Sequence, residues 1–240
     1  MSNGSVGPKL LAGFGQSIEE RIISELGATP SDQFPELEDV KNPAGESTGY
    51  VHVFKAEKLD KAACMSINVM PGGRYFNIHI IPQAQYNIPR FNFEGMVTSH
   101  GSKISMDLYP DIDVIMDIHK FKELCSGVTS IYDKARKSEI TFQPSRYTHM
   151  RAFCSPYFLN APDVAPKNLT ILEEIANQYF DVWLNIYHAA ELLGAREAEE
   201  RQLRREHIAR TIVEMDPDRD MIVKVYGEEA VCSIEAAMMV

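Results

Sequence analysis

The chain has 240 residues, of which 45% are hydrophobic and 24% charged, and its formal net charge at pH 7 is −10. This length and composition are typical of a globular protein with one large domain or two small ones. The negative charge argues against nucleic acid as a partner, and no apolar run is long enough for a membrane span. We therefore expect neither nucleic-acid binding nor a membrane span.

The cysteines are far apart in the sequence and form no CxxC pair: Cys64, Cys125, Cys154 and Cys232. We therefore expect no zinc or iron–sulfur site on cysteine, and the spacing fits a reducing compartment. The first residues contain no basic segment followed by an apolar core, so we expect no secretory signal. The expected location is the cytoplasm of a bacterium, or the plastid stroma if a transit peptide has been removed.

Residues 1–15 contain glycine and serine and are expected to be flexible, whereas residues 16–240 are expected to form a single domain. The first predicted helix covers residues 17–26. Ser17 is its expected N-cap, and Gly27 is expected to end it.

Strands are predicted next, because short apolar stretches alternate with turn residues. They cover residues 49–56, 63–70, 74–82, 90–97 and 103–110. Turn sequences at 71–73 and 99–102 indicate two hairpins, which favours a meander of antiparallel strands over alternating strand–helix units. Residues 146–156 are interpreted as a further strand, near the sheet edge or the substrate face.

Most of the second half of the chain is predicted to be helical, over residues 118–137 and 168–193. Residues 195–215 are very polar and predict an exposed helix. Pro217 breaks this helix, and Asp216 is the expected N-cap of the last one. Strands followed by helices predict an α+β domain with helices on both faces of the sheet.

Glu94 lies in the middle of the apolar strand Phe-Asn-Phe-Glu-Gly-Met-Val. Burial removes water from a carboxyl group and raises its pKa, which suits a proton donor near neutral pH. The alternative is that Glu94 points to solvent from a half-buried strand. The strand pattern alone leaves both interpretations open.

The sequence contains no motif of a nucleotide-binding loop, a dinucleotide fold, a zinc protease or a serine hydrolase. His79 alternates with Asn77 on one strand face, where a lone histidine is more often a hydrogen-bonded core residue than a ligand. Arg151 is interpreted as part of an apolar strand, so it needs an anionic partner, either a protein acid or a ligand carboxylate.

Three blocks of sequence carry a resemblance to a known family. The first covers residues 77–110, the second combines 150–156 with 181–187, and the third covers 215–230. In these blocks the chain resembles the ferredoxin-dependent bilin reductase superfamily, and within it most closely red chlorophyll catabolite reductase.

The resemblance implies a three-layer α/β/α sandwich around a central antiparallel sheet. A linear tetrapyrrole is then expected to bind between the sheet and the C-terminal helices. No flavin, metal or nicotinamide is expected. Reduced ferredoxin would supply single electrons, and side chains and water would supply protons, in a radical mechanism.

The resemblance also implies roles for individual residues. Glu94 falls on the acid of the central strand, which is aspartate in most bilin reductases and glutamate in the chlorophyll-catabolite branch. Asp216 matches a second proton donor. Asn77 stands where phycocyanobilin synthases carry histidine, so their four-electron reaction is not expected. The expected substrate-binding residues are Asn77, His79, Lys103, Arg151, Ser155 and Arg219, with Arg151 contacting a propionate.

The leading hypothesis is therefore a ferredoxin-dependent reductase that acts on double bonds of an open-chain tetrapyrrole, either red chlorophyll catabolite or a biliverdin-type bilin. The alternatives are a non-catalytic tetrapyrrole carrier or sensor, and a pocket for another conjugated ligand. Ferredoxins are generally acidic, so docking needs a local basic patch. The cations within residues 120–137 are the first candidates, unless they form only a solvated helix face of mixed charge.

Overall fold

The structure is a computed structural model and describes residues 13–239. The first twelve residues of the segment expected to be flexible therefore lie outside the described residues. Phe14, which belongs to the same segment, is fully buried in the core. No helix within residues 13–239 combines the length and the apolar character needed to cross a membrane.

The fold is built on one eight-stranded antiparallel sheet with the order β1-β3-β4-β5-β6-β7-β8, and β2 also pairs with β3. Both predicted hairpins are present, as β4–β5 and β6–β7. The strands are β1 (Thr29–Pro30), β2 (Val40–Lys41), β3 (Ser47–Lys55), β4 (Leu59–Met70), β5 (Gly73–Pro82), β6 (Arg90–Thr98), β7 (Ser102–Tyr109) and β8 (Leu159–Val164).

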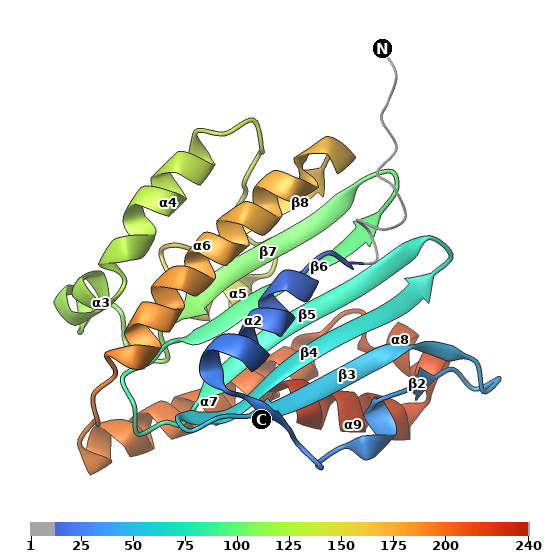
Figure 1. Cartoon of the computed structure of the whole chain (residues 1–240), viewed down its shortest axis with the longest axis horizontal. Helices are drawn as coiled ribbons and strands as arrows, with labels where there is room; N and C mark the ends of the chain where they lie inside the picture. The colour runs from blue at the N-terminus through green and yellow to red at the C-terminus, as the bar shows by residue number, and fades with distance from the viewer. Residues whose placement is uncertain (1–12, 240) are drawn as a thin grey trace.

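Helices cover both faces of the sheet, which confirms the predicted three-layer α/β/α sandwich of the α+β class. Helices α2, α4 and α6 lie over one face, and α7, α8 and α9 lie behind the other (Figure 1). Their bounds are α2 (Gln16–Leu26), α3 (Ile118–Leu124), α4 (Ser126–Arg136), α5 (Thr148–Phe153), α6 (Leu169–His188), α7 (Ala195–Met215), α8 (Arg219–Tyr226) and α9 (Glu228–Met239).

The two faces of the sheet differ in chemistry, because side chains alternate along each strand. Phe91 and Phe93 of β6 are fully buried in the larger core, with side chains of α2 and α6. Arg90, Asn92 and Glu94 of the same strand point to the opposite face. There a smaller apolar core joins β3 and β4 to α8 and α9. The remaining part of this second face, over β5, β6 and β7, is called the polar face below.

One predicted strand is a helix. Residues 146–156 were interpreted as a strand, but they contain the short helix α5, and the edge strand is β8 instead. Arg151 is therefore exposed on a helix and does not lie in an apolar strand. The sequence pattern misled because apolar and polar residues alternate only briefly here, and Pro156 then ends the segment before β8 begins.

Two predicted caps are also wrong. Gly15 is the N-cap of α2, and the hydroxyl of Ser17 donates instead to Glu173 of α6 at 3.3 Å. Asp216 is the C-cap of α7, whereas Asp218 is the N-cap of α8. The predicted C-cap at Gly27 is confirmed, with a left-handed φ of 60°.

Helix α7 is not the uniformly exposed helix that its polar sequence predicted, because Arg201 and Arg205 are only 3% and 6% exposed. Arg205 donates through Nε to Asp111 at 2.7 Å, and Arg90 of β6 donates through Nη2 to the same carboxylate at 2.6 Å. We call Arg90, Asp111 and Arg205 the Asp111 cluster. Burial would raise the pKa of Asp111, but the two guanidinium groups outweigh it and hold this pKa below its ordinary value.

We predict that Asp111→Asn lowers the free energy of unfolding by about 3–5 kcal/mol, because two buried guanidinium groups lose their carboxylate partner. Urea unfolding measures this loss. Asp133→Asn is the matched control, since Asp133 is exposed on α4, and it should change stability by no more than about 0.5 kcal/mol. Equal losses in the two variants would contradict a stabilising role for the Asp111 cluster.

Candidate active site

Glu94 lies on the polar face and accepts hydrogen bonds from three neighbouring strand residues. The hydroxyl of Tyr75 donates to Oε2 at 3.0 Å, and the side-chain amide of Asn77 donates to the same oxygen at 3.2 Å. The hydroxyl of Ser105 donates to Oε1 at 3.1 Å. The strand register explains the geometry, because Asn77 of β5 and Ser105 of β7 are the direct partners of Glu94.

The glycine that follows Glu94 permits this close pairing. A Cβ atom at Gly95 would lie 2.2 Å from the carbonyl oxygen of Lys103 and 2.6 Å from Cδ1 of Ile104. Any other residue would therefore push β7 away from β6. The Glu-Gly pair keeps Ser105 within hydrogen-bonding distance of the carboxyl group.

The surroundings of Glu94 favour its neutral form. Burial is the largest effect and raises the pKa of the carboxyl group, and the negative charge of Asp216 raises it further. The hydrogen bonds from Tyr75 and Ser105 act in the opposite direction and only partly offset this effect. Glu94 is half-buried and points to the sheet face that the C-terminal helices cover. It therefore does not point into open solvent, which was the alternative interpretation of its strand.

Asp216 approaches the same region from the helical layer. It directly follows α7, is exposed, and accepts a hydrogen bond from the backbone N–H of Asp218 at 2.9 Å. Its charge acts on both Glu94 and Tyr75. The structure thus brings the two predicted acids near each other, one from the sheet and one from the turn between α7 and α8.

Asn77 and His79 lie beside Glu94 on β5 and are 3% and 2% exposed. Asn77 links Glu94 to Asn92, whose amide donates to the Asn77 oxygen at 3.2 Å. The imidazole of His79 contacts the Met238 carbonyl oxygen at 2.8 Å through Nδ1, and Arg90 at 3.5 Å through Nε2. Burial, followed by the charge of Arg90, lowers the pKa of His79 to about 3, so the ring is neutral near pH 7.

Ser155 is engaged by an acid that the sequence analysis missed. Asp107 of β7 is fully buried and accepts hydrogen bonds from the Ser155 hydroxyl and from the Ser155 N–H, the latter at 2.7 Å. Burial raises the pKa of Asp107 to about 6, although these hydrogen bonds lower it. The contact fixes the segment that follows α5 against the sheet.

The three cations predicted to bind substrate have different surroundings. Arg219 opens α8 and donates to Glu235 at 2.8 Å and to Glu228 at 2.7 Å. Lys103 and Arg151 are exposed, on β7 and α5, and within residues 13–239 neither has an ion-pair partner. Lys103 alternates with Ser105 and so points to the same side of the sheet as Glu94.

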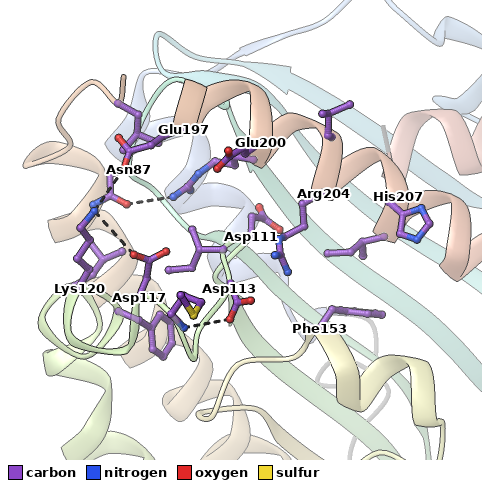
Figure 2. A pocket seen from close by; sticks show the side chains of 18 of the residues that line it. Asn87, Asp111, Asp113, Asp117, Lys120, Phe153, Glu197, Glu200, Arg204 and His207 are labelled. Carbon is purple, nitrogen blue, oxygen red and sulfur yellow. Dashed lines mark hydrogen bonds and ion pairs between the residues drawn. The ribbon is translucent and has the colours of Figure 1, made fainter. Parts of the chain in front are cut away.

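A groove of about 1400 Å³ lies between α5 and α7 and is called the α5–α7 groove (Figure 2). Its wall includes Phe153, whose ring packs edge-on against Tyr109 with 5.6 Å between the ring centres. Neither Glu94 nor Asp216 lines the groove. However, its lining on α7 extends to Thr211, about one helical turn before Asp216.

Among residues 13–239, no group of three or more His, Cys, Asp or Glu side chains could hold a metal ion. The residues that sequence analysis missed are Tyr75, Ser105, Asp107 and the Asp111 cluster. Strand alternation contained the signal for most of them, because Tyr75, Ser105 and Asp107 share a face with Asn77 and Glu94 once the hairpin registers are known.

We predict that Tyr75→Phe raises the pKa of Glu94 by about one unit, because it removes a hydrogen bond to the ionised carboxylate. Difference infrared spectroscopy of the carboxyl band as a function of pH measures this pKa, with Glu94→Gln identifying the band. Tyr132→Phe is the control, since Tyr132 packs against Tyr157 on the far side of the sheet. An unchanged or lower pKa in Tyr75→Phe would contradict the hydrogen-bond assignment.

Comparisons with known proteins place the chain in a family. The family model described as ferredoxin-dependent bilin reductase matches residues 15–232. Tomato phytochromobilin synthase, solved in complex with biliverdin, has the same fold, with a TM-score of 0.79 and 17% identity over 92% of this chain and 80% of that one. No curated protein sequence matches the chain. Because the family model covers most of the sequence, the protein belongs to the ferredoxin-dependent bilin reductase family.

Proposed function

We propose that the protein is a ferredoxin-dependent reductase of an open-chain tetrapyrrole, formed by a single domain over residues 16–240. The observation that carries this proposal, beyond family membership, is the position of Glu94 on the polar face, where its carboxyl group accepts hydrogen bonds from three strand side chains. Burial raises the pKa of this carboxyl group, which suits a proton donor that Tyr75, Asn77 and Ser105 hold in place.

In the proposed reaction, one electron from reduced ferredoxin converts the tetrapyrrole into a radical anion, which is more basic than the neutral pigment. The radical anion takes the proton of Glu94. A second electron and a second proton complete the reduction of one double bond. Asp216 or water supplies this second proton, and solvent restores the proton of Glu94.

We also propose which open-chain tetrapyrrole is the substrate. Glu94 in place of aspartate, together with Arg151, Ser155 and Pro156, follows the pattern of the chlorophyll-catabolite branch. Red chlorophyll catabolite is therefore the first substrate to test, and a biliverdin-type bilin is the second. A non-catalytic carrier would bind the pigment without any spectral change when reduced ferredoxin is added.

Substrate contacts are proposed from the same side of the sheet. Lys103 and Arg151 are exposed cations that can contact a carboxylate directly. The side-chain polar atoms of His79, Ser155 and Arg219 already bond to protein groups. We assign these three to positioning the walls of the site, and Asn77 to orienting Glu94.

Docking of ferredoxin is proposed at α3 and α4. Lys122, Lys134 and Lys137 are exposed there and have no carboxylate partner within the described part of the chain. Lys120 differs from them, because it pairs with Glu197 at 3.4 Å. The proposed location of the protein is the bacterial cytoplasm or the plastid stroma, where reduced ferredoxin is present.

We predict that Glu94→Gln lowers turnover with reduced ferredoxin by about 10²–10⁴-fold while binding of the tetrapyrrole is retained, because glutamine keeps the shape but has no acidic proton. Absorption spectra under anaerobic conditions report both quantities, with red chlorophyll catabolite and biliverdin tested separately. Glu174→Gln, an exposed change on α6, is the matched control. Unchanged turnover in Glu94→Gln would remove Glu94 as the donor.

We predict that Lys134→Glu combined with Lys137→Glu raises the KM for ferredoxin several-fold at low salt, because like charges slow the encounter with an acidic partner. The difference from wild type should shrink at high salt, since screening removes the long-range term. Steady-state rates at two ionic strengths measure this effect. A KM that stays at the wild-type value at low salt would show that ferredoxin docks elsewhere.

A further inference from the structure

Ion pairs lie at one end of the α5–α7 groove, and Arg204 and His207 lie at the other. Near the paired end, Lys120 contacts Glu197 at 3.4 Å and Arg196 contacts Glu200 at 2.8 Å. Further along α7, Arg204 and His207 also line the groove, and both are exposed. Among the described residues, neither of these side chains has an ion-pair partner.

Buried charge behind this part of the groove is also positive. Arg90, Arg201 and Arg205 are nearly fully buried, and within residues 13–239 Asp111 is the only carboxylate to which any of them bonds. Arg201 donates to the carbonyl oxygen of Ile88 at 2.9 Å, while its Nε has no hydrogen-bond partner in the described part of the chain. Burial first, and then repulsion by Arg205, lowers the pKa of Arg201 to about 10.

This buried positive charge is expected to act locally, on the part of the groove beside Arg204, because acids outnumber lysines and arginines over the groove lining as a whole. Water screens buried charges only weakly, so their field extends into a cleft that they adjoin. Arg201 itself lines the groove, between the paired end and Arg204. An anion bound beside Arg204 would therefore be attracted by the fixed charges as well as by its direct contacts.

The opposite wall of the groove has apolar side chains beside the acids Asp113 and Asp117. Phe153 of α5 lies across from α7 (Figure 2). Ala152 of α5 also lines the groove, as do Phe121 and Leu124 of α3. Ile208 of α7 adds a further apolar side chain beside His207. Such a concave cleft suits a flat conjugated molecule that carries an acidic side chain, whereas a protein partner would need a larger and flatter surface.

We propose that Arg204 and His207 form a carboxylate subsite that binds an acidic side chain of the tetrapyrrole in the α5–α7 groove. The two residues are three positions apart on α7, so they are neighbours on one face of the helix. The subsite lies on α7 and is separate from Lys103 and Arg151. This inference rests on the proposed function, since it names where that substrate is held.

The test compares biliverdin with its dimethyl ester, which has the same conjugated system but no carboxylates. Absorption titration of the full-length protein gives Kd for both ligands. Wild type should bind the diacid about 10-fold or more tightly than the ester, as expected for a charged hydrogen bond. In Arg204→Gln combined with His207→Gln, diacid binding should weaken by a similar factor while ester binding stays unchanged.

Arg210→Gln is the matched control, because Arg210 is exposed on the same helix but does not line the groove. It should keep the preference for the diacid. If the double variant also keeps this preference, or if wild type has none, the subsite is wrong while the proposed function stands. Equal loss of both ligands in a folded double variant also overturns it, since the effect is then not on the carboxylate.

Two other outcomes of these binding experiments lead to different conclusions. If wild type binds neither biliverdin, its ester nor red chlorophyll catabolite, the proposed function fails and the subsite fails with it. If the double variant binds both ligands normally but has a raised KM for ferredoxin, the cations contact ferredoxin and the carboxylate subsite is overturned.

Discussion

Asp111 holds the helical layer to the polar face of the sheet, and the candidate site depends on this connection. Its carboxylate bonds to Arg90 of β6 on one side and to Arg205 of α7 on the other. The residue follows β7 with a left-handed φ of 51°, a conformation that aspartate tolerates better than most residues. Because α7 ends at Asp216, the position of that acid relative to Glu94 follows from where the Asp111 cluster fixes the helix.

Burying polar side chains on the polar face costs folding free energy, and the same burial raises the pKa of Glu94. An antiparallel sheet covered on both faces usually buries apolar side chains on each, and here β5, β6 and β7 carry Asn77, Asn92, Glu94 and Asp107 instead. Each of these four bonds to another polar group, which limits the penalty of burial. The network gives Glu94 donors on both oxygens, and its pKa is still raised because burial outweighs these hydrogen bonds.

The parts of the fold and of the candidate site that depend on local sequence signals were predictable, whereas those that depend on contacts between distant residues were not. Strands 74–82 and 90–97 were predictable because alternation and turn residues are local signals, and Glu94 was identifiable as an acid among apolar neighbours. The Asp111 cluster was not, since it joins residues 94 positions apart in the chain, and Arg205 looked like any other charge on a polar helix. The helix at Arg151 was missed because a six-residue helix has too few turns to establish a period.

The net charge of −10 sets a condition on how electrons reach the site. An acidic ferredoxin is repelled by the whole molecule at long range, so productive encounters depend on places where cations outnumber acids. The lysines of α3 and α4 form one such place, and Arg201, Arg204 and Arg205 form a local cluster of cations on α7. The first lies on an outer helix surface, and in the second Arg204 lines a groove in front of buried positive charge. A convex surface suits a protein and a concave one suits a small anion, which is why the two basic regions are assigned to different partners.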